Sequence, residues 1–121
     1  MGRGSSGKSG NRSSEPTLQQ QIDAARSSIT GKSEKQISYA LDLLDRYISQ
    51  KQEFIKSQQR FISSYEGKMS AGDTTRDWNA RIKKRQEAIE IEQKRIKAAI
   101  SINDAGEIID ALTSGIRRSL F

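Results

Sequence analysis

A seven-residue repeat of apolar pairs runs through the middle of the chain and restricts its fold more than any other feature. Each pair is an aromatic residue followed by isoleucine, with five mostly polar residues before the next pair: Tyr47-Ile48, Phe54-Ile55 and Phe61-Ile62. Because seven residues are close to two turns of an α-helix, the pairs fall on one side of a helix over about residues 34–66. Three further isoleucines at the same spacing predict a second long helix over about residues 74–102: Ile82, Ile89 and Ile96.

The two isoleucine series match each other across a loop. Residues 67–73, with Gly67 and Gly72, break the repeat. Folding the chain there pairs isoleucines in three layers: Ile48 with Ile96, Ile55 with Ile89, and Ile62 with Ile82. Within one residue, the same register sets Tyr65 near Trp78, Lys51 near Glu92 and Gln58 near Arg85. We therefore expect a long antiparallel helical hairpin; the alternative is a homodimeric coiled coil, in which each seam pairs with a second copy.

The first long helix carries two adjacent apolar stripes, so it needs two neighbours. One stripe is an aliphatic seam: Ile37, Leu41, Leu44, Ile48, Ile55 and Ile62. The other lies roughly 100° around the helix: Ala40, Leu43, Tyr47, Phe54, Phe61 and Tyr65. We interpret the aromatic members as buried core; the alternative is a platform on which nucleic-acid bases stack. Trp78 is expected to staple the hairpin turn.

A short helix is expected before the hairpin, over about residues 17–30. Thr17 and Gln20 have the spacing of a capping box, in which each side chain bonds the backbone of the other residue. Gly31 stands where a helix often ends in the left-handed conformation. Ser33 and Gln36 then repeat the capping-box spacing at the start of the hairpin.

A second short helix is expected after the hairpin, over about residues 104–118. Asp104 and Glu107 again have the capping-box spacing. This helix is expected to pack on a secondary stripe of the preceding helix: Ala88, Ile91, Ala98 and Ile102. The fold class is therefore all-α, with two short helices packed on a long hairpin.

The first sixteen residues read as a disordered basic tail. Residues 1–16 contain four glycines and five serines, and Met1 is their only apolar side chain. Such a segment buries too little apolar surface to offset the entropy of ordering. We expect residues 17–121 to form a single helical domain.

The composition argues against most enzyme classes. The chain has no cysteine and no histidine, so thiolate chemistry, imidazole bases and the commonest zinc ligands are absent. No apolar run approaches the roughly 18 residues that span a bilayer. We expect a cytoplasmic, non-enzymatic protein with no catalytic residues, no metal, no cofactor and no membrane partner.

Charge is the feature that points to a ligand. The formal net charge is +6. Its densest part is a set of cations on the third predicted helix: Arg81, Lys83, Lys84, Arg85, Lys94, Arg95 and Lys97. The tail adds Arg3, Lys8 and Arg12. A basic helix with a basic arm is typical of nucleic-acid binders, in which such side chains contact phosphates. The alternative is a solvated surface, since Glu87, Glu90 and Glu92 interrupt the cations.

Residues 33–44 resemble a short helical element, S/T-x-K-Q followed by an aromatic residue and a leucine pair. Here these positions are Ser33-Glu34-Lys35-Gln36, Tyr39 and Leu43-Leu44. The element occurs in assorted bacterial and bacteriophage proteins, several of them linked to DNA metabolism. The hairpin with a tryptophan beside its turn is also similar to the small secreted WXG-type hairpins, although Trp78-Asn79-Ala80 lacks their glycine.

Together these features predict a nucleic-acid-associated accessory protein, encoded by a phage or mobile element. The rival class is a protein–protein interaction module, such as a virion or scaffold component or a small inhibitor of a host enzyme.

Overall fold

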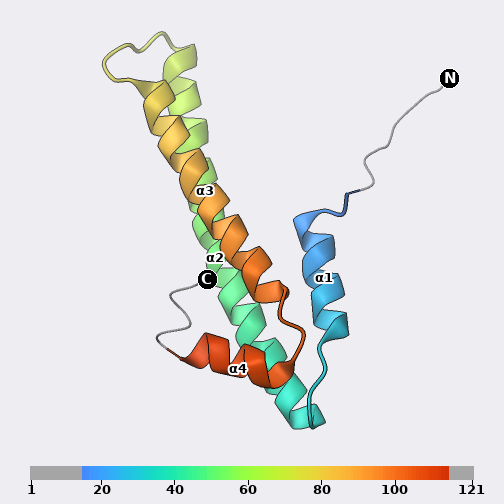
Figure 1. Cartoon of the computed structure of the whole chain (residues 1–121). Coiled ribbons are helices and arrows are strands. Elements are labelled where there is room, and N and C mark those ends of the chain that lie inside the picture. Colours follow the sequence, from blue (N-terminus) through green and yellow to red (C-terminus); the bar gives the residue numbers. More distant parts are fainter. Residues whose placement is uncertain (1–14, 115–121) are drawn as a thin grey trace, which may run out of the picture.

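The computed structural model of the chain describes residues 15–114, and helices form its regular secondary structure (Figure 1). The helices are α1 (Leu18–Ser28), α2 (Glu34–Ser70), α3 (Trp78–Ile100) and α4 (Ala105–Thr113). The expected all-α architecture is therefore confirmed. Most of the expected tail, with Arg3, Lys8 and Arg12, lies outside the described residues.

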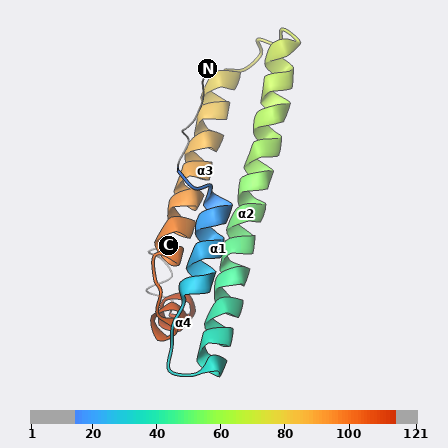
Figure 2. The same ribbon diagram turned by 90° about the vertical axis from the view of Figure 1, so that its right-hand side faces the viewer.

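Helices α2 and α3 form the antiparallel hairpin, and its register is the expected one (Figures 1 and 2). Three cross-hairpin contacts recur every seven residues. Lys51 Nζ lies 3.2 Å from Glu92 Oε2, Arg85 Nη1 donates to Gln58 Oε1 at 3.0 Å, and the Tyr65 and Trp78 ring centroids are 5.5 Å apart. Isoleucine layers lie between these contacts, so the two seams meet within one chain.

The hydrophobic core lies at the base of the hairpin, which we define as the end where α2 begins and α3 ends. Leu44 of α2, Ile96 of α3 and Ile108 of α4 are the largest fully buried side chains. Ile22 of α1 joins the same cluster. All four helices thus contribute to one core, and it occupies only part of the hairpin's length.

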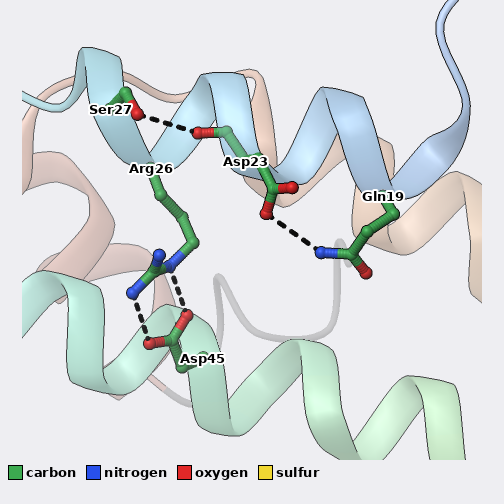
Figure 3. A network of polar contacts seen from close by, with 5 residues as sticks. All are labelled: Gln19, Asp23, Arg26, Ser27 and Asp45. Carbon is green, nitrogen blue, oxygen red and sulfur yellow. Dashed lines mark hydrogen bonds and ion pairs between the residues drawn. The ribbon is translucent and has the colours of Figure 1, made fainter.

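The short helices pack on opposite sides of this base (Figures 1 and 2). Helix α1 lies against α3. An ion pair joins it to α2 (Figure 3): Arg26 Nε donates to Asp45 Oδ1 at 2.8 Å, and Arg26 Nη2 donates to Asp45 Oδ2 at 3.1 Å. This double hydrogen bond raises the pKa of Arg26. Within α1, Asp23 accepts from Gln19 Nε2 at 3.0 Å and from Ser27 Oγ at 3.1 Å (Figure 3).

Helix α4 does not use the secondary stripe of α3, and that expectation was wrong. It packs mainly on α2, and Ile91 of the stripe is 50% exposed. The cause is the short connection of residues 101–104. The Thr30 amide donates to Asn103 O at 2.9 Å, and the Ala105 amide donates to Thr30 O at 2.7 Å. These bonds hold the start of α4 beside the α1–α2 connection, so α4 crosses α2.

Helix α1 ends differently from the expectation. It stops at Ser28, and Ile29 is extended with φ −67° and ψ 130°. Ile29 is buried, which places its side chain in the core. Gly72 is the glycine with positive φ among the described residues, so the left-handed conformation expected at Gly31 was wrong. Thr30 leaves the helix because its backbone bonds the chain before α4.

The remaining helix ends differ by a few residues from those expected. Helix α2 continues to Ser70, and Gly72, at φ 81°, makes the turn. Helix α3 starts only at Trp78 because Asp77 caps it, its Oδ1 accepting from the Ala80 amide at 3.1 Å. Helix α3 ends at Ile100 rather than 102. Helix α4 ends at Thr113 rather than 118, since Ser114 is extended, and residues 115–121 lie outside the described range.

Candidate nucleic-acid interface

The seven cations singled out from the sequence all lie on α3, but they do not form one cluster. A helix turns by about 100° per residue, so the set divides between two sides of the hairpin. One side carries Arg81, Lys84, Arg85 and Arg95, and the other carries Lys83, Lys94 and Lys97. The basic helix expected from the sequence therefore presents two surfaces with different surroundings.

The first side is hollowed beyond the base. A depression of about 350 Å³ is lined by residues of both long helices: Phe54, Gln58, Tyr65, Arg81, Lys84, Arg85 and Ala88. A second depression, of about 500 Å³, is lined by Arg76, Asp77, Ala80, Arg81 and Lys84. Arg81 and Lys84 line both, so the two depressions adjoin. We call this surface the distal face and define it by eight side chains: Phe54, Phe61, Tyr65, Arg76, Trp78, Arg81, Lys84 and Arg85.

The aromatic rings of the distal face are more open than expected. Phe54 is 43% exposed and Phe61 is 42% exposed, so the buried-core interpretation was wrong for these two residues. It holds for Tyr47, which packs against the core cluster. The difference arises because α1 and α4 cover only the base of the hairpin, while the distal half of α2 has α3 as its neighbour.

Arg85 organises the distal face. Its guanidinium carbon lies 4.1 Å from the Phe61 ring centroid, a cation–π contact. Its Nη1 donates to Gln58 Oε1 at 3.0 Å, and its Nη2 donates to the Tyr65 hydroxyl at 3.4 Å. A guanidinium has five N–H donors, so these bonds leave donors for a ligand. Arg85 therefore holds the rings in place in addition to carrying charge.

The other cations of this face are directed to solvent. Arg76, Arg81 and Lys84 are exposed, and no carboxylate within residues 15–114 forms an ion pair with them. Arg81 lies over the Trp78 ring, with its guanidinium carbon 5.8 Å from the centroid. Asp77 is the carboxylate among the described lining residues, and its Oδ1 is engaged by the Ala80 amide. Among the described lining residues the cations therefore outnumber the carboxylates, and the face carries a net positive charge.

Arg76 was missed by the sequence reasoning, because it lies in the hairpin loop, away from the dense run on α3. The loop itself is well anchored. Trp78 Nε1 donates to Asp73 O at 3.1 Å, which confirms that Trp78 staples the turn. The Thr75 hydroxyl and amide both donate to Asp73 Oδ1, at 2.6 Å and 2.8 Å, and these bonds lower the pKa of Asp73.

Arg95 pairs with a buried carboxylate, although its own side chain is 42% exposed. Its Nη1 lies 2.5 Å from Glu92 Oε1, and Lys51 Nζ approaches the other oxygen of the same carboxylate. Glu92 is buried, only 5% exposed. The buried Glu92 carboxylate requires a neutralising cation, and Arg95 serves as one. We therefore remove Arg95 from the candidate phosphate contacts.

The second side of α3 matches the solvated-surface interpretation. Lys83, Lys94 and Lys97 are exposed there, and so are the carboxylates Glu87 and Glu90. No aromatic side chain lies on this side of the described part of α3. These three lysines thus form a surface of mixed charge without rings.

No protein-family model, curated protein or solved structure matches this chain. Within the described residues, no group of three or more Asp and Glu side chains is placed to hold a metal ion. In the same range, no helix combines the length and apolar character that crossing a bilayer requires.

Proposed function

We propose that this protein is a non-enzymatic nucleic-acid-binding accessory protein that uses the distal face of its hairpin. The observation that carries the proposal is the gathering of four cations from α3 and the loop beside exposed rings: Arg76, Arg81, Lys84 and Arg85. Cations without acidic partners bind phosphates by releasing condensed counterions, which favours a polyanionic ligand. Such a protein acts in the cytoplasm, where DNA and RNA are accessible to it.

Two further features support the proposal. The net charge of +6 attracts polyanions at long range. Residues 33–44 also resemble an element of proteins linked to DNA metabolism. Arg3, Lys8 and Arg12 add to the phosphate contacts if the basic arm reaches the same polymer.

The test compares two triple variants that remove equal charge from opposite sides of the hairpin. One is Arg76→Gln, Arg81→Gln and Lys84→Gln on the distal face; the matched control is Lys83→Gln, Lys94→Gln and Lys97→Gln. Fluorescence anisotropy with labelled DNA and RNA gives the affinity at several salt concentrations. Each lost phosphate contact should flatten the plot of log K against log[salt] by roughly 0.7–0.9. We expect a change of about two to three for the distal-face variant and little change for the control.

Two results contradict the proposal. Equal weakening by both variants indicates that net charge alone attracts the polymer, without a defined site. Absence of binding to DNA and RNA at low ionic strength indicates that the distal face has another ligand. Circular dichroism of each variant checks that its helices are intact.

The protein–protein alternative has its own supporting observation, the 50% exposure of Ile91 on α3. A pull-down from native extract with and without nuclease separates the two classes. Loss of all partners after nuclease treatment favours nucleic acid, and one protein retained after treatment favours the alternative.

A further inference from the structure

We infer that the distal face binds single-stranded rather than duplex nucleic acid, with Phe54 and Phe61 as the platform for its bases. The inference rests on the proposed function and specifies its ligand. It follows from the position of the rings, from how they are held, and from where the cations lie beside them.

The exposed Phe54 and Phe61 rings can stack on unpaired bases. Phe54 and Phe61 lie seven residues apart on one side of α2, which is about 10 Å along the helix axis. Each leaves more than 40% of its surface to solvent. A duplex buries its base faces between neighbouring pairs and offers only edges and phosphates. Exposed rings therefore add binding energy only to a strand whose bases are unpaired.

The Phe61 ring is held before any ligand arrives. Arg85 lies over Phe61, and the Phe61 and Tyr65 centroids are 6.2 Å apart. Tyr65 in turn packs on Trp78, with centroids 5.5 Å apart. Ordering a side chain during binding costs free energy, so a ring already fixed by its neighbours loses less on stacking.

The cations form a track beside the rings. Phe54 lines the same depression as Arg81 and Lys84, and Arg76 continues the positive surface toward the hairpin loop. A basic track along a row of aromatic side chains is the common arrangement of single-strand binders. The same charge disfavours a second copy of this chain at the distal face, because two such faces would repel each other.

The experiment measures binding of an oligothymidylate of about 20 nucleotides and of a duplex of equal length, a size above the roughly 4–16 nucleotides of known single-strand sites. The test variant is Phe54→Ala with Phe61→Ala. The rescue variant is Phe54→Tyr with Phe61→Tyr, which keeps both rings. The control is Ile91→Ala, an exposed apolar residue outside the distal face. Thermal melts of all variants report on folding.

We expect the wild-type protein to prefer the single strand. The alanine variant should bind the single strand at least about fivefold more weakly, the lower limit for one lost base stack. Its duplex binding should not change, and the tyrosine and Ile91→Ala variants should resemble wild type.

Four results overturn the inference. Equal affinity for duplex and single strand, or full single-strand affinity in the alanine variant, refutes base stacking while leaving the phosphate-binding proposal intact. Absence of binding to either polymer at low salt refutes both. Loss of a protein partner in the alanine variant, without loss of nucleic acid, assigns the distal face to the rival class.

Discussion

Gly31 lies where the chain leaving α1 passes the first residue of α4. A Cβ atom at this position would stand 2.9 Å from Ala105 Cβ, 2.9 Å from Gln36 Oε1 and 3.1 Å from Ile37 Cγ1. The absence of a side chain, rather than a left-handed backbone, is thus what this position requires. It lets the backbone of Thr30 reach its two hydrogen bonds with the chain before α4.

We expect Gly31→Ala to lower the free energy of unfolding by about 1–3 kcal/mol, because the added methyl overpacks a fixed contact. Urea denaturation measures the change. Gly67→Ala is the matched control, since nothing lies within 4 Å of its would-be Cβ and alanine favours the helix. Unchanged or increased stability of Gly31→Ala would refute the close approach of these two segments.

Ile96 and Ile91 are on the same helix in opposite environments. Ile96 is fully buried, whereas Ile91 is half exposed. Ile96→Ala should lower the free energy of unfolding by about 2–5 kcal/mol, because it leaves a cavity in the core. Ile91→Ala should change it by no more than about 0.5 kcal/mol. Similar losses at both positions would show that another surface covers Ile91 in solution.

At the scale of the elements, the hairpin carries a buried charge between its isoleucine layers. Glu92 of α3 is held by Lys51 of α2 and by Arg95 one turn further along α3. Lys51 Nζ also lies 5.1 Å from the Tyr47 ring centroid. Only the observed register brings Lys51 to this carboxylate, so the pair disfavours a shifted pairing of the two helices.

Lys51→Met should therefore destabilise the protein, by roughly 1–3 kcal/mol, because a buried carboxylate loses one of its two cations. Combining it with Glu92→Leu should recover most of the loss, since an apolar pair of similar size replaces an ion pair with little cost. Denaturation of both single variants and the double variant completes a double-mutant cycle. Additive effects would indicate that Lys51 and Glu92 do not interact.

At the scale of the whole molecule, the isoleucine seams of α2 and α3 pack on each other within one chain. This arrangement distinguishes the hairpin from the coiled-coil dimer that the same repeat allows. Cysteines introduced as Ile55→Cys and Ile89→Cys are the only thiols in the protein. They should form a disulfide within one chain on oxidation, at a rate independent of protein concentration. Non-reducing gels measure the mass of the oxidised product. A main product of twice the monomer mass would favour the dimer.

The lengths of the helices divide the molecule into two parts. Helix α2 has 37 residues, whereas α1 has 11 and α4 has 9. At about 1.5 Å per residue, each short helix is less than a third as long as α2. The base is therefore a packed four-helix unit, and the distal half is a bare pair of helices with exposed side chains.

The sequence by itself determined the four helices, the starts of α1, α2 and α4, and the register of the hairpin. Thr17 and Gln20 form the expected capping box, and the Glu107 amide donates to Asp104 Oδ2 at 3.0 Å. Ser33 also caps α2, but the Gln36 side chain accepts from the Lys32 amide instead of completing the box. The caps depend on residues a few positions apart, and the hairpin register depends on two isoleucine series that share a seven-residue period. Spacing along the sequence is therefore sufficient to predict both.

Only the tertiary structure decided which stripes and charges stay open to solvent. Phe54 and Phe61 follow Tyr47 at seven-residue steps on one stripe, yet Tyr47 packs against the core whereas both phenylalanines are more than 40% exposed. Arg95 and Arg81 are both cations of one basic helix, yet Arg95 neutralises Glu92 and Arg81 faces solvent. The physical reason is that exposure and ion pairing depend on what lies across the hairpin and how far α1 and α4 extend, whereas helical periodicity records only the direction in which a side chain leaves its own helix.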